Sequence, residues 1–237
     1  MRAVILAGGL GTRLKPYTTL IPKPLVPLGG KCAIVELVIL QLKKYGFTHV
    51  TLAVNHLAQL VMAYFGDGSK YDLNIDYSLE KHELSTIGPI TLIDDLPENF
   101  LVINGDVLSN LDYGLFLEKH IQGGSSISVA SCQREAKIDF GVLQFDKNNR
   151  LTGFEEKPSI KYDVSMGAYC LTRELIYGLT RGERFGFDDL MLKSLSENWS
   201  VSIYSFDGFW LDIGRPEDYG YADENFAQIL KDLEIEL

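Results

Sequence analysis

Cysteine is scarce in this chain and shows no paired spacing. The 237 residues contain three cysteines and four histidines, with no C-x-x-C pair and no H-E-x-x-H motif. A disulfide framework and the common zinc sites are therefore not indicated. We expect Cys32, Cys132 and Cys170 to be free thiols in a reducing compartment.

Basic residues are in the minority, and long apolar runs are missing. The chain has 22 Lys and Arg against 32 Asp and Glu, for a net charge of -10. Such an acidic chain is a poor non-specific binder of nucleic acid, so any phosphate ligand has to be held by a local site. The apolar run before Gly8 is too short for a signal peptide or a membrane span. We therefore expect a soluble cytoplasmic protein with no nucleic-acid or membrane partner.

The pattern of apolar segments predicts a single α/β domain over residues 1–237. Hydrophobic residues make up 46% of the chain, enough for a substantial core. The first half alternates strands with helices, which predicts a Rossmann-like, mainly parallel sheet flanked by helices; extra strands in the second half make it mixed. No hexapeptide repeat follows Leu237, so no C-terminal β-helix domain is expected. The expected strands are 3–7, 49–54, 73–77, 100–104, 126–131, 141–145, 164–171, 200–206 and 209–212, and the expected helices are 34–45, 57–65, 113–122, 188–197 and most of 216–237.

Candidate site residues follow several of the expected strands. Gly8, Gly9, Asp106 and Asp212 each come directly after an apolar strand. Ligands of open α/β sheets bind at the carboxyl ends of the strands, so these residues are expected to converge there.

The stretch L-A-G-G-L-G-T-R-L, residues 6–14, matches neither familiar glycine fingerprint. Gly9-x-Gly11 begins the dinucleotide pattern, but Leu14 stands where the third glycine belongs, and no Lys-Ser or Lys-Thr pair follows as in a P-loop. A loop of small residues with free N–H groups, followed by Arg13, can still hold a polyphosphate. The alternative is a tight turn in which glycine supplies a positive φ.

Lys23 favours the phosphate interpretation of that loop. It stands between Pro22 and Pro24, which restrict its backbone, ten residues after Arg13. Together the two cations could clamp a polyphosphate, whereas the ordinary alternative is a solvated surface lysine.

These residues resemble the signature of the sugar-1-phosphate nucleotidyltransferases, also called nucleoside-diphosphate-sugar pyrophosphorylases. The signature runs through G-G-L-G-T-R-L to P-K-P, and the similarity continues at I-N-G-D, F-G-V-L-Q-F-D, G-F-E-E-K-P and F-W-L-D-I-G-R-P-E-D-Y. The resemblance implies a GT-A-like fold with a nucleotide-binding half, 1–110, and a sugar-phosphate half, 111–237. It also implies Mg²⁺, an NTP and a sugar 1-phosphate as ligands, and an NDP-sugar and pyrophosphate as products.

The resemblance also implies individual roles. Arg13, Lys23, Asp106 and Lys157 would be catalytic, and Asp106 and Asp212 would hold Mg²⁺. The residues assigned to the nucleotide are Leu6, Ala7, Gly8, Gly9, Gly11, Thr12, Arg13, Glu80, Thr86 and Gly88. Those assigned to the sugar phosphate are Lys23, Phe140, Gly141, Glu156, Lys157 and Ser165.

Two departures from the family pattern bear on specificity. Glu83 and Ser85 replace a proline and a glycine near the base, and Ser165 replaces an asparagine that usually contacts the sugar. The T-x-G-P segment at Thr86 resembles the mannose-1-phosphate guanylyltransferase branch, which favours GTP with a mannose- or heptose-like sugar 1-phosphate for surface polysaccharide biosynthesis. Uridylyl, thymidylyl and cytidylyl transfer stay open.

Two other classes compete with the transferase. A non-catalytic regulatory protein on this fold would be expected to lose part of the catalytic set, all of which is present. A glycosyltransferase of related fold would carry Asp-x-Asp, whereas Val107 and Leu108 follow Asp106. The helix expected from Pro216 could pack internally or form an interface, so a homodimer or homotetramer is open.

Overall fold

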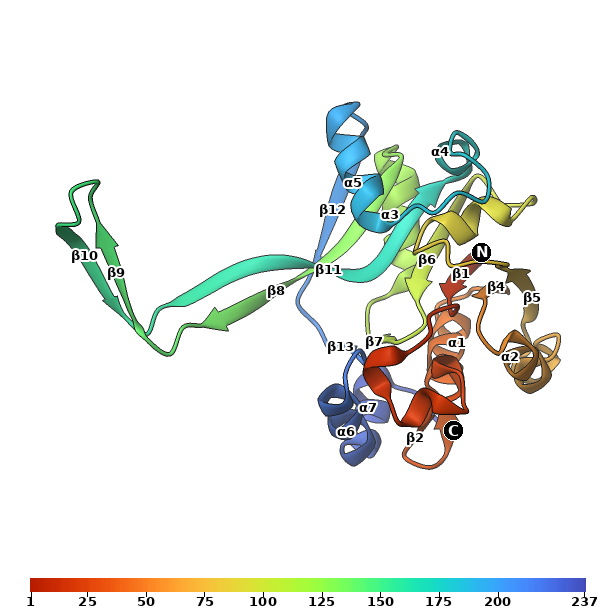
Figure 1. Cartoon of the computed structure of the whole chain (residues 1–237). Coiled ribbons are helices and arrows are strands. Elements are labelled where there is room, and N and C mark those ends of the chain that lie inside the picture. The colour runs from red at the N-terminus through yellow and green to blue at the C-terminus, as the bar shows by residue number, and fades with distance from the viewer.

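A seven-stranded mixed sheet forms the centre of the computed structural model, which describes residues 1–237 (Figure 1). Its strand order is β12-β8-β11-β6-β1-β4-β5. Neighbouring strands are parallel except for β11, which is antiparallel to both β6 and β8. The expected mixed, mainly parallel sheet is therefore confirmed. The strands are β1 (Arg2–Leu6), β4 (His49–Val54), β5 (Asn74–Leu79), β6 (Asn99–Asn104), β8 (Ile127–Lys137), β11 (Ser159–Thr172) and β12 (Val201–Phe206).

Helices cover both faces of this sheet. Alternate residues of β1 divide between two buried apolar clusters, because Ala3 and Ile5 face one layer and Val4 the other. α1, α2, α3, α6 and α7 contribute to the larger cluster, and α4 and α5 to the smaller one. The helix expected from Pro216 is interrupted at Asn225. The helices are α1 (Ile34–Lys44), α2 (Ala58–Phe65), α3 (Tyr113–Gly123), α4 (Arg173–Tyr177), α5 (Phe187–Ser196), α6 (Pro216–Glu224) and α7 (Phe226–Leu233).

Three small strand pairs lie outside the main sheet. The pair β7 (Val107–Ser109) and β13 (Trp210–Asp212) is antiparallel and sets Asp212 opposite Val107. This pairing brings a late segment of the chain to the end of β6. The other two pairs are β2 (Pro27–Leu28) with β3 (Cys32–Ala33), and β9 (Gly141–Phe145) with β10 (Leu151–Glu156).

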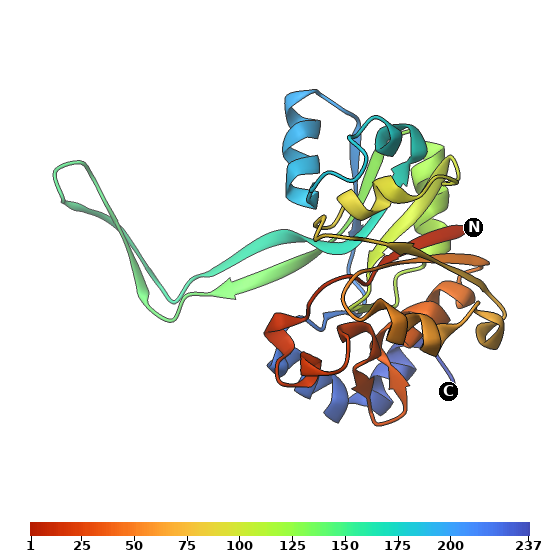
Figure 2. The same ribbon diagram turned by 45° about the vertical axis from the view of Figure 1, so that its right-hand side comes forward.

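β8 and β11 extend well beyond the sheet as a two-stranded ribbon. Their pairing continues from Ser131 opposite Ser165 to Lys137 opposite Ser159, and β9 and β10 continue it after a bend. Figures 1 and 2 both show this ribbon projecting from the body. The expected strands 126–131 and 164–171 cover only the part within the sheet. The outer residues are mostly exposed on both sides, so no alternation of apolar and polar residues marks them.

The cysteines are all buried and free, as expected. Burial raises the pKa of the Cys170 thiol, which disfavours the reactive thiolate. Separately, none of the helices combines the length and the hydrophobicity that crossing a membrane requires.

Replacing Leu37 of α1 with Ala should lower the free energy of unfolding by about 2–5 kcal/mol. Leu37 is fully buried in the larger cluster, so the variant loses apolar burial and leaves a cavity. Urea unfolding followed by circular dichroism measures the change. Leu60→Ala on α2 is the control: Leu60 is 46% exposed, and its removal should cost well under half as much. Equal losses would contradict this description of the core.

Candidate active site

Two adjoining cavities lie at the carboxyl ends of the central strands. The first has a volume of about 700 Å³ and the second about 560 Å³. Both are lined by Arg13, Asn104 and Gly214, so the cavities meet at these residues. Leu6 of β1 pairs with Asn104 of β6, and the loops that leave these two strands therefore begin side by side. The position matches the expected convergence at the strand ends.

The glycine loop forms one wall of the first cavity. None of the backbone N–H groups of residues 8–13 donates to a backbone carbonyl. A side-chain hydrogen bond stabilises the loop, because the Thr18 hydroxyl donates to the Gly11 carbonyl at 2.7 Å. Gly11 has a φ of 61°, and a Cβ on Gly8 would lie 2.5 Å from the Glu80 carboxylate. The loop thus combines free N–H donors with a left-handed turn at Gly11 that favours glycine.

Lys23 reaches from this loop to the end of β6. Its backbone begins a short 3-10 helix, in which the Leu25 N–H donates to the Pro22 carbonyl at 2.8 Å. The Lys23 ammonium forms an ion pair with the Asp106 carboxylate, and both side chains are less than one fifth exposed. Lys23 is therefore a positioned cation, and the alternative of a solvated surface lysine is excluded.

Asp212 joins the same group of charges from the other end of the chain. The Ile213 N–H donates to the Asp106 carbonyl at 2.9 Å, which extends the β7–β13 pairing to the two aspartates. Burial and the neighbouring Asp106 charge raise the pKa of Asp212, while Lys23 and Arg13 act in the opposite direction. Two carboxylates and two cations therefore meet where the cavities join.

The two aspartates fit the requirements of a divalent cation. No cluster of three or more His, Cys, Asp or Glu side chains is present, so the protein offers no closed metal cage. Mg²⁺ commonly binds through one or two carboxylates together with substrate phosphates and water. The like-charge repulsion at Asp106 and Asp212 is what a cation would relieve.

The first cavity is also lined by Glu80, Asn55 and Thr86, of which Asn55 follows β4 and Glu80 follows β5. Burial raises the pKa of Glu80, and the Leu84 N–H donates to its carboxylate at 3.2 Å. The Thr86 hydroxyl accepts the Phe187 N–H at 2.7 Å, so it also anchors the start of α5. Gly88 does not line either cavity. It packs behind the wall, where a Cβ would lie 2.5 Å from the Glu183 carbonyl.

The second cavity contains residues that the sequence interpretation did not select. Arg134 lies over the Trp210 ring at 4.5 Å, and the Trp210 indole N–H donates to the Met166 carbonyl at 2.9 Å. Arg215 adds a further cation, and the expected Ser165 is also in the lining. Arg215 falls within the block F-W-L-D-I-G-R-P-E-D-Y that resembles the family, so the sequence already pointed to this segment. Arg134 lies in none of the blocks that carry the resemblance.

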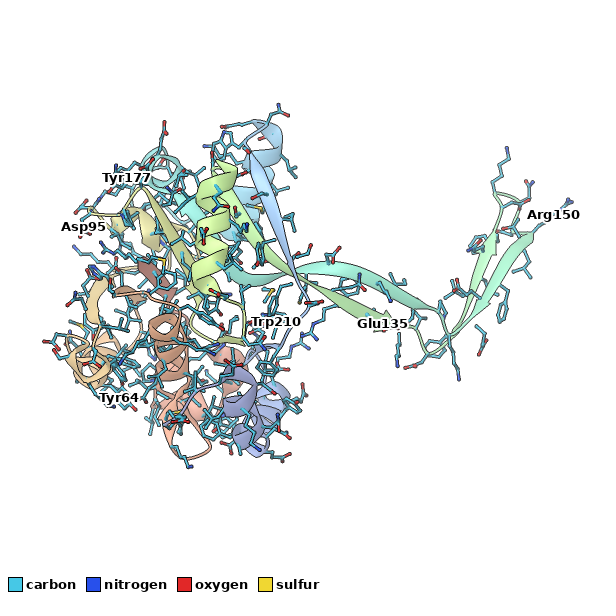
Figure 3. The ribbon with its side chains drawn as sticks, turned by 180° about the vertical axis from the view of Figure 1, so that it is seen from behind. Tyr64, Asp95, Glu135, Arg150, Tyr177 and Trp210 are labelled. Atoms are coloured by element: carbon cyan, nitrogen blue, oxygen red, sulfur yellow. The ribbon has the colours of Figure 1, made fainter.

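The structure therefore brings together most, but not all, of the expected site. The first cavity is lined by Leu6, Ala7, Gly8, Gly9, Gly11, Thr12, Arg13, Lys23, Glu80, Thr86 and Asp106, and the second by Arg13, Ser165 and Asp212. Four expected residues lie on the projecting ribbon and line neither cavity: Phe140, Gly141, Glu156 and Lys157. Figure 3 shows the ribbon leaving the body near Trp210, with Glu135 along it and Arg150 near its tip.

Comparison with known proteins gives a consistent picture. A family model described as nucleotidyl transferase matches residues 2–229. The chain is 34% identical to the D-glycero-alpha-D-manno-heptose 1-phosphate guanylyltransferase of Campylobacter jejuni, covering 92% of this chain and 97% of that protein. It is 29% identical to a UTP–glucose-1-phosphate uridylyltransferase of Synechocystis, covering 94% of this chain but only 62% of that longer protein. The structure of HddC from Yersinia pseudotuberculosis complexed with GMP-PN has a TM-score of 0.72 at 28% identity, covering 95% of this chain and 99% of that one.

Replacing Asp212 with Asn should raise the melting temperature at pH 7 in metal-free buffer by about 2 °C. The pKa of Asp212 is higher in the folded protein than in the unfolded chain, whose value is near 3.8. The folded state then binds the proton more tightly, so stability is lost as the pH rises through the folded-state pKa. The gain from Asn should therefore be full at pH 7 and shrink as the pH approaches 4.

Asp207→Asn is the matched control for that melt, since Asp207 is an exposed carboxylate on the same segment. It should leave the melting temperature unchanged at both pH values. A lower melting temperature for Asp212→Asn at pH 7 would show that the carboxylate stabilises the fold.

Proposed function

Because the chain belongs to the nucleotidyl transferase family, we propose that it transfers the nucleotidyl group of an NTP to a sugar 1-phosphate. An oxygen of the sugar phosphate attacks the α-phosphorus, the bond from that phosphorus to the bridging oxygen breaks, and pyrophosphate leaves with the electron pair. The attacking oxygen is already anionic, so no general base is needed. Catalysis then consists of alignment and charge stabilisation.

The observation that carries this proposal is the meeting of two cavities at one group of charges. Free amides at residues 8–13, together with Arg13 and Lys23, suit the phosphates of an NTP in the first cavity. Arg215 and Arg134 suit a sugar phosphate in the second. Asp106 and Asp212 would hold Mg²⁺, which supplies neutralising charge to the phosphates when bound.

Glu80 favours GTP as the nucleotide. Guanine presents two adjacent donors, the ring N1–H and the exocyclic amino group, and an ionised carboxylate is an acceptor for both. Uracil and thymine present a single donor between two acceptors, which leaves a carboxylate facing an oxygen. The Glu80 carboxylate lines the first cavity after β5, whereas Asp106 follows β6, with β4 and β1 between these two strands in the sheet. A nucleotide with its phosphates at Lys23 and Asp106 would therefore extend its base toward Glu80. The guanylyl relative supports this assignment.

The second substrate in the proposal is a sugar 1-phosphate of manno configuration, mannose or a heptose. The Campylobacter relative supports it through its named heptose substrate, and the chain spans nearly all of that protein. Ser165 faces the second cavity, and its hydroxyl is 3.2 Å from the Tyr169 hydroxyl, so both could meet sugar hydroxyls.

The direct test is pyrophosphate release from five NTPs, each with a panel of sugar 1-phosphates and Mg²⁺. GTP with mannose or manno-heptose 1-phosphate should give the highest kcat/KM. Asp106→Ala should lower it by about 100-fold or more, since the charge group loses one of its two carboxylates. Faster release with UTP and glucose 1-phosphate would overturn the guanylyl assignment. No release with any pair would favour a regulatory protein.

Glu80→Gln tests the base assignment. Glutamine offers one donor and one acceptor, so kcat/KM for GTP should fall about 100-fold while that for UTP or dTTP rises. Glu118→Gln on α3 is the matched control, because Glu118 is an exposed carboxylate that lines neither cavity. Its GTP preference should be unchanged. An unaltered preference in Glu80→Gln would remove Glu80 from base recognition.

A further inference from the structure

The projecting ribbon, residues 133–163 and hereafter the arm, carries a large apolar surface that nothing in the chain covers. Phe140 is 77% exposed and Phe154 60% exposed. The other large apolar side chains exposed on the arm are Leu143, Phe145, Leu151, Ile160 and Tyr162. An isolated two-stranded ribbon is marginal in water, and open strand edges invite pairing. The exposed apolar side chains and open edges of the arm are therefore available for contact with another surface.

The arm is fixed to the body by contacts at its base. Arg134 stacks on Trp210, and Val164 and Ser165 line the second cavity, so the arm starts in the wall of the site. From there the β8–β11 pairing is continuous to Lys137 and Ser159. At about 3.3 Å per residue, Lys157 lies about 20 Å beyond Val164. The arm cannot return Lys157 to its own cavity while that pairing persists.

The bend of the arm presents a charged group. Lys157 has a φ of 47°, an unusual conformation for a residue with a side chain, and with Pro158 it links the end of β10 to the start of β11. Glu156 precedes it, and both are exposed. These two residues are among those expected at the sugar phosphate, yet neither side chain forms a hydrogen bond or ion pair within the chain.

We propose that the arm of one chain packs on the body of a second copy and supplies Glu156 and Lys157 to that copy's second cavity. The inference rests on the proposed function, since it assigns the arm to the sugar-phosphate side of that site. By two-fold symmetry each body receives one arm, so both sites are completed in trans.

The body provides a surface that suits the arm of a second copy. Leu192 and Leu195 of α5 and Ile203 of the edge strand β12 are all more than 60% exposed. Figures 1 and 2 both show α5 and β12 on the side of the body from which the arm leaves, as a reciprocal contact requires. The arm has six basic and six acidic residues, so the whole net charge of -10 belongs to the bodies. A neutral arm can approach an acidic body without net repulsion.

Complementation between two inactive variants tests the trans arrangement. Lys157→Ala and Asp106→Ala chains, carrying different tags, are co-expressed and purified through both tags. A mixed dimer then holds one site with an intact body and an intact arm, so it should show about half of the wild-type activity. Asp106→Ala with Lys23→Ala is the matched control, because both changes lie in the body and no site is intact.

A cross-link provides a readout that does not need activity. Lys157→Cys in one chain and Asp218→Cys in the other should form a disulfide band of twice the chain mass, since Asp218 lines the second cavity. Leu60→Cys on α2, at the other end of the sheet, should not cross-link to Lys157→Cys. A monomer in light scattering, or a dimer lacking both complementation and the cross-link, overturns the proposal. The cross-link without any transferase activity would instead reject the proposed function and keep the trans arm.

Discussion

The ion pair between Lys23 and Asp106 connects the segments on which the whole site depends. Lys23 belongs to the loop that follows β1, and Asp106 follows β6. Asp212 joins them through the strand pair β7–β13, so residues more than a hundred positions apart share one electrostatic environment. Two cations balance two carboxylates there. On the proposed function, each added phosphate disturbs that balance, which is why a divalent cation and further arginines belong beside it.

Bringing these charges together lowers the stability of the folded state. The central sheet nevertheless holds the charged residues in position. β1 and β6 are parallel neighbours with fully buried residues on both faces, so the ends of these strands are held in register. The unfavourable pKa of Asp212 is a local strain on the folded state. A rigid support permits such strain at sites that bind ions or phosphates.

The apolar residues of the body and those of the arm differ in how they are covered. The two apolar clusters need no partner, since their members are buried within one chain. The arm differs because its apolar residues face water on both sides. Contact with a second copy would cover the exposed apolar surface of the arm. The same contact would supply Glu156 and Lys157 to the second cavity. Assembly and catalysis would then depend on the same strands.

The sequence by itself determined the α/β class and the strand-end position of the cavities, because short-range patterns encode them, whereas the family resemblance supplied most of the residues that line the first cavity. Apolar runs followed by glycine or aspartate placed Gly8, Asp106 and Asp212 without any coordinates. Only the tertiary structure decided that Gly88 lies behind the cavity wall, that Arg134 lines the second cavity and that Lys157 lines neither cavity. Those positions depend on how far the β8–β11 pairing continues. Pairing between residues exposed on both faces leaves no hydrophobic period in the sequence, so its length and direction appear only in the folded chain.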